Sequence, residues 1–76
     1  MNSSIDEIAD FLLSTGCFKK MKARGFAEVL VTKHQIDTLF LLSSVSKSGA
    51  LSDILKEIGN ISESAIEIVQ SKAFQL

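Results

Sequence analysis

The chain has 76 residues, a formal net charge of −1 and 46% hydrophobic residues. This length predicts a single domain spanning residues 1–76, and the near-neutral charge provides no general attraction to nucleic acid or to anionic membranes. The single cysteine excludes an internal disulfide and fits a reducing, cytoplasmic compartment. No signal peptide is expected, and the longest apolar run, residues 39–42, is far shorter than the roughly 18 residues of a membrane-spanning helix.

The first predicted helix covers residues 4–15. Ser4 and Glu7 match a capping box, in which each side chain bonds the backbone amide of the other residue. Gly16 is a natural stop, because glycine adopts the left-handed conformation without steric cost. The buried stripe would consist of Ile5, Ile8, Ala9 and Leu12, with Phe11 or Leu13 beside it.

Residues 17–31 leave alternatives open. Phe18, Met21 and Phe26 could define one face of a short basic helix that ends at Gly25, or the same stretch could be a loop. Residues 26–31 are too few to separate a strand from a helical turn by their periodicity. A helix is favoured there because the chain offers no second strand for pairing.

The central prediction is a helix over residues 33–47, the most apolar part of the chain. Thr32 and Gln35 repeat the capping-box pattern and place its start at residue 33. A helix that is apolar all round is typical of a buried position. Gly49 would separate it from a helix at about 50–58, and Gly59-Asn60 would end that second helix.

The last predicted helix covers residues 63–74, with Ser62 as its N-cap and Ile61 and Ile66 as a hydrophobic staple. Its inward-facing residues would be Ala65, Ile68, Val69 and Ala73. The predicted fold is therefore all-α, with four or five short helices in a compact orthogonal or irregular bundle around helix 33–47.

The strongest local feature is a basic cluster formed by Lys19, Lys20, Lys22 and Arg24. Interleaved aromatic and apolar residues would let this segment contact phosphates or an anionic surface. The simpler interpretation is a solvated basic face opposite the acidic first helix of the same or another subunit. Residues 50–69 also loosely match a helix-turn-helix, but Glu63 and Glu67 in its second helix would be repelled by DNA.

No catalytic, cofactor or metal site is predicted. Cys17 and His34 are the only nucleophile–base pair, and Cys17 follows a helix C-terminus, which does not favour a thiolate. His34 is expected at the surface. Asp6 and Asp10 share a helix face, but no further oxygen ligand is near them in sequence.

The predicted function is a small intracellular protein–protein interaction or regulatory module without catalytic activity, which self-associates as a homodimer or binds a protein partner. The reason is that so short a chain cannot enclose so many apolar residues. The alternative is a nucleic-acid-binding, helix-turn-helix-like regulator that uses residues 18–26. The predicted apolar interface comprises Phe18, Met21, Phe26, Leu41, Leu42 and Phe74.

Overall fold

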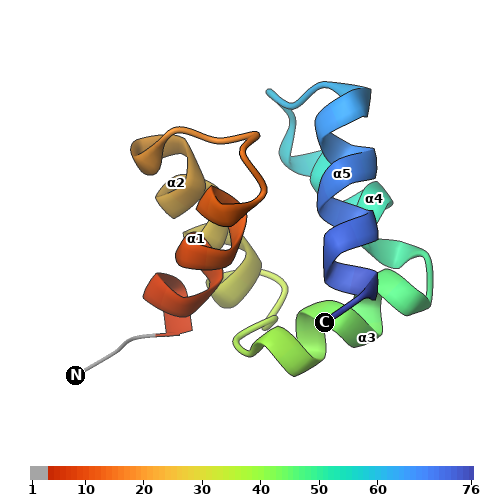
Figure 1. Ribbon diagram of the computed structural model, residues 1–76. Helices are drawn as coiled ribbons and strands as arrows, with labels where there is room; N and C mark the ends of the chain where they lie inside the picture. The colour runs from red at the N-terminus through yellow and green to blue at the C-terminus, as the bar shows by residue number, and fades with distance from the viewer. Residues whose placement is uncertain (1–3) are drawn as a thin grey trace.

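The computed structural model describes residues 4–76, which form five short helices and no strand. They are α1 (Ser4–Ser14), α2 (Lys20–Thr32), α3 (Leu39–Lys47), α4 (Ala50–Ile58) and α5 (Glu63–Phe74). The all-α prediction is confirmed. Figure 1 shows α1 paired with α2 on one side, and α3, α4 and α5 packed together on the other. None of the helices in this part of the chain is long and apolar enough to cross a membrane.

One hydrophobic core joins the two groups of helices. The rings of Phe18 and Phe26 meet edge to face with centroids 5.0 Å apart, and Ile36 reaches the core from the loop after α2. The largest fully buried apolar side chains come from all five helices: Ile8, Leu12, Leu30, Leu42, Leu51, Leu55 and Val69. The exclusion of these side chains from water is the main stabilising contribution to the fold.

Helix α1 follows its prediction closely. It buries Ile8, Ala9 and Leu12, and the chain leaves it through Gly16 at a φ of +79°. Ser4 is the first residue within the helix and is therefore not the N-cap that the capping-box pattern predicts.

Helix α2 resolves the ambiguity over residues 17–31. Gly25 lies inside this helix and does not end it. The burial of Ala23, Phe26 and Leu30 along one face outweighs the cost of about 0.5–1 kcal/mol for a glycine within a helix. Met21 does not share that face, because its side chain is 89% exposed.

The predicted start of the central helix at residue 33 is wrong, and α3 begins at Leu39. The Thr32 hydroxyl donates backward to the Glu28 carbonyl at 2.6 Å and so does not act as a cap. Residues 33–38 form a loop, and Thr38 caps α3 by accepting a hydrogen bond from the Leu41 amide at 3.0 Å. The loop is favoured because it places Ile36 in the core.

The boundaries of the last two helices are confirmed. Gly49 and Gly59, both at a φ of +83°, flank α4, and the Ser62 side chain accepts from the Ala65 amide at 3.2 Å to start α5. The inward face of α5 contains the predicted Val69 and Ala73 but differs at other positions, and Ala65 is only half-buried. Ile66 is buried, whereas Ile68 is 40% exposed.

Candidate interaction surfaces

The predicted apolar interface is divided between the core and the surface. Phe18, Phe26 and Leu42 are buried within the chain, so they cannot contact a partner in this conformation and are removed from the interface. The other three predicted residues remain exposed at the surface: Met21, Leu41 and Phe74.

Phe40, which the sequence prediction left out of the interface, is 78% exposed. The inward face of α3 consists of residues 39, 42, 43 and 46, at helical spacing, but residues 43 and 46 are serines. Ser46 is buried because its hydroxyl donates to the Gln70 carbonyl of α5 at 2.7 Å. Because two of the four inward-facing residues are serines, the spacing of apolar residues does not identify this face. Phe40 lies outside it and is therefore exposed.

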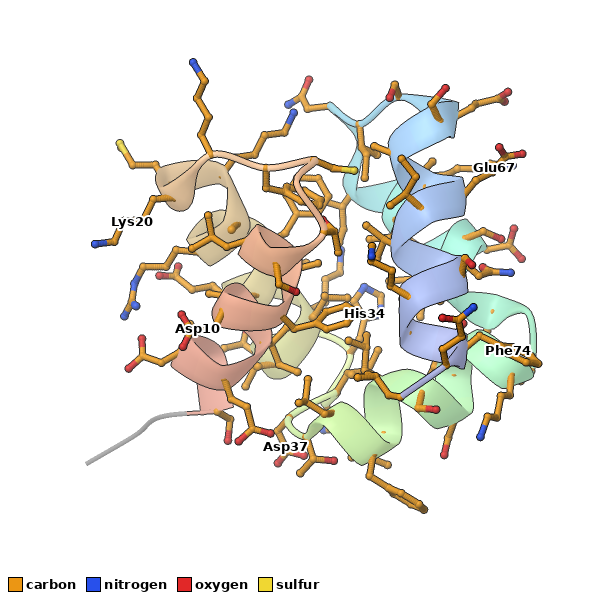
Figure 2. All side chains as sticks on the ribbon, in the orientation of Figure 1. Asp10, Lys20, His34, Asp37, Glu67 and Phe74 are labelled. Atoms are coloured by element: carbon orange, nitrogen blue, oxygen red, sulfur yellow. The ribbon has the colours of Figure 1, made fainter. Side chains whose placement is uncertain are left out.

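A groove of about 510 Å³ runs along α4 and α5. Its apolar lining residues are the buried Ile66 and Phe74, which is 53% exposed. Glu67 also lines the groove, and Figure 2 shows Glu67 and Phe74 on the same side of the molecule. The Gln70 side-chain oxygen accepts a hydrogen bond from the Ser52 amide at 3.0 Å, which ties α5 to the start of α4.

The four basic residues of the cluster are all exposed, but Arg24 differs from the three lysines in forming ion pairs. Arg24 donates from Nη1 to Asp6 Oδ1 at 2.5 Å, and its Nε lies 3.9 Å from Glu28 Oε1. The hydrogen bond and the charge of Asp6 raise the pKa of Arg24. This contact confirms, for Arg24, the predicted approach of the basic segment to the acidic first helix.

The three lysines of the cluster take no part in that contact. Lys22 Nζ lies 6.0 Å from the centroid of the Phe26 ring, a distance at the limit of a cation–π interaction. In the part of the chain that the structure describes, no ion pair involves Lys19 or Lys20. Their charges are available to a partner.

His34, which the sequence places at the surface, is half-buried. Figure 2 shows its side chain directed into the molecule, between the α1–α2 pair and α5. Its Nε2 is buried and has no hydrogen-bond partner. Such an unpaired polar atom disfavours the folded state, because it has lost its bond to water.

Cys17 and His34 are not brought together as a catalytic pair. Cys17 precedes α2 and His34 follows it, and a helix of this length separates its ends by about 20 Å. Cys17 is half-buried, with Sγ 3.8 Å from the Thr15 carbonyl oxygen.

The acidic residues of α1 do not assemble a metal site. Asp6 binds Arg24 and Asp10 is exposed. Within residues 4–76, no group of three or more histidine, cysteine, aspartate or glutamate side chains is placed to hold a metal ion.

The described residues thus form a small all-α bundle with a groove along α4 and α5 and a basic cluster at the start of α2. Comparisons with protein-family models, with curated proteins and with solved structures found no match to this chain.

Proposed function

We propose that this protein is a small protein–protein interaction or regulatory module that self-associates and has no catalytic activity. The observation that supports this proposal is the exposure of large apolar side chains outside a completed core. Met21 is 89% exposed, Phe40 is 78% exposed and Phe74 is 53% exposed. Full burial of such a side chain stabilises a complex by about 1.5–3 kcal/mol.

The positions of these side chains support docking between helical surfaces. Phe40 belongs to the first turn of α3, and Phe74 lines the α4–α5 groove. Helix-in-groove recognition uses a few apolar anchors set in a polar surround. A cytoplasmic location fits the same proposal, because the free Cys17 would stay reduced there.

Light scattering coupled to size exclusion tests this proposal. The mass of the wild type should exceed 8.3 kDa, the mass of one chain, and should rise with concentration. Phe40→Ala and Phe74→Ala test whether the two exposed rings contribute, and Ser44→Ala, at an exposed position of α3, is the control. Detection should use refractive index, because the chain contains no tryptophan or tyrosine. A mass of one chain at every concentration would contradict self-association.

The alternative proposal is nucleic-acid binding through the basic cluster. It is supported by the exposed Lys19 and Lys20, which form no ion pair among the described residues. It is weakened by the burial of Phe18 and Phe26, since bases cannot stack on buried rings. Replacing Lys19, Lys20 and Lys22 with alanine should abolish duplex binding at moderate salt, and retention of binding would contradict this alternative.

A further inference from the structure

We infer that the self-association proposed above is head to tail: Met21 of one copy, with the lysines beside it, enters the α4–α5 groove of a second copy. This inference rests on the proposed function and specifies the two surfaces that meet. It also identifies the partner as another copy of this chain.

The first surface is a protruding apolar side chain between two positive charges. Met21 lies in the first turn of α2 between Lys20 and Lys22, and it is the most exposed large apolar residue among those described. Methionine is unbranched and polarisable, so it fits irregular apolar sites and contacts aromatic rings favourably. We call residues 20–22 the basic tip.

The second surface is the α4–α5 groove, whose lining includes two apolar and two acidic residues of α5. Ile66 and Phe74 are its apolar lining residues, and a methionine sulfur can contact the Phe74 ring. Glu63 and Glu67 line it from α5, and Lys56 lines it from α4. Two lysines that enter beside Met21 are therefore attracted to the α5 side and repelled from Lys56. The excess of acidic over basic side chains in the lining matches the positive charge of the basic tip.

The two surfaces face away from each other on one molecule. Figure 2 shows Lys20 on one side, and Glu67 and Phe74 on the opposite side, of the bundle. A twofold dimer needs its contact residues on a single face, so it cannot pair both tips with both grooves. A head-to-tail contact leaves a free tip and a free groove at the ends, to which further copies add as the concentration rises.

Two charge-reversal variants test this arrangement by sedimentation velocity. The groove variant carries Glu63→Lys and Glu67→Lys, and the tip variant carries Lys20→Glu and Lys22→Glu. In each variant alone, the tip and the groove carry charges of the same sign and repel each other. The association constant should therefore fall by about tenfold or more. In an equimolar mixture each tip meets a groove of opposite charge, and association should return to near the wild-type level.

The mixture also guards against misfolding, because an unfolded variant cannot restore association. A control with Lys47→Glu and Lys72→Glu changes the net charge as much as the tip variant, at positions outside both surfaces, and should associate like the wild type. If the wild type associates but either variant associates equally well, or the mixture does not recover, the head-to-tail contact is wrong. A monomeric wild type would instead contradict self-association itself.

Discussion

Arg24 of α2 donates a hydrogen bond to Asp6 of α1 at 2.5 Å, so the first two helices are joined by a charged pair as well as by apolar packing. Both side chains remain about half exposed, at 55% and 47%. An ion pair in water contributes little to stability, because solvent screens the charges and both side chains lose freedom. The pair therefore orients the basic segment more than it stabilises the bundle.

Replacing Arg24 with alanine should lower the urea midpoint slightly at low salt, and the difference from wild type should vanish at about 1 M salt. The pKa of Arg24 is raised in the folded chain. Its contribution is thus fully present below the unfolded pKa and is lost only as the pH rises through the folded value, so it is constant near neutrality. Lys20→Ala, which removes no ion pair, is the control. A loss that persists at high salt would show that Arg24 acts through packing.

Gly25→Ala should stabilise the protein by about 0.5–1 kcal/mol, because alanine loses less conformational entropy in a helix. An added Cβ at this position meets nothing within 4 Å. The matched variant is Gly59→Ala, because Gly59 has a φ of +83° and a ψ of −178°. Backbone strain at this position should lower the free energy of unfolding by about 1–3 kcal/mol. Urea unfolding followed by far-UV circular dichroism measures both. If Gly25→Ala destabilises the protein, residue 25 is not in a regular helical conformation.

Two threonines distinguish the observed start of α3 from the one predicted by the capping-box pattern. Thr38→Ala should cost about 1 kcal/mol, because it removes the acceptor for the Leu41 amide. Thr32→Ala removes only a bond to a carbonyl one turn back and should change stability by about 0.5 kcal/mol or less. Thermal unfolding of the two variants compares them directly. The reverse order would place the helix start at residue 33.

His34→Leu should stabilise the fold by roughly 1 kcal/mol, because it removes a buried nitrogen that has no hydrogen-bond partner. His34→Gln is the control, since it keeps a polar group at the same place and should give no gain. The urea midpoint of each variant is the measurement. A loss of stability in the leucine variant would show that the imidazole has a partner in solution.

The elements that the sequence predicted correctly are those set by local backbone chemistry. Gly49, Gly59 and Ser62 each satisfy a cap or a turn on their own, and the bounds of α4 and α5 followed from them. The start of α3 was missed because Thr32 and Gln35 also match a cap in sequence. A tertiary contact decides against that cap, because residues 33–38 form a loop that places Ile36 in the core.

The surfaces were harder to predict than the helices. Phe18 and Met21 are both apolar residues in a basic segment. The Phe18 ring packs on Phe26, whereas the Met21 side chain is exposed. That choice depends on where α2 begins and how it packs on α1. The α4–α5 groove combines residues from two helices, and spacing along one helix gives no sign of it.

Sedimentation equilibrium of the wild type, followed by interference optics over a wide concentration range, is the most direct test of self-association through the exposed apolar side chains. We expect a weight-average mass that rises above 8.3 kDa and continues to rise past that of two chains. A mass that stays at 8.3 kDa at every concentration would contradict it.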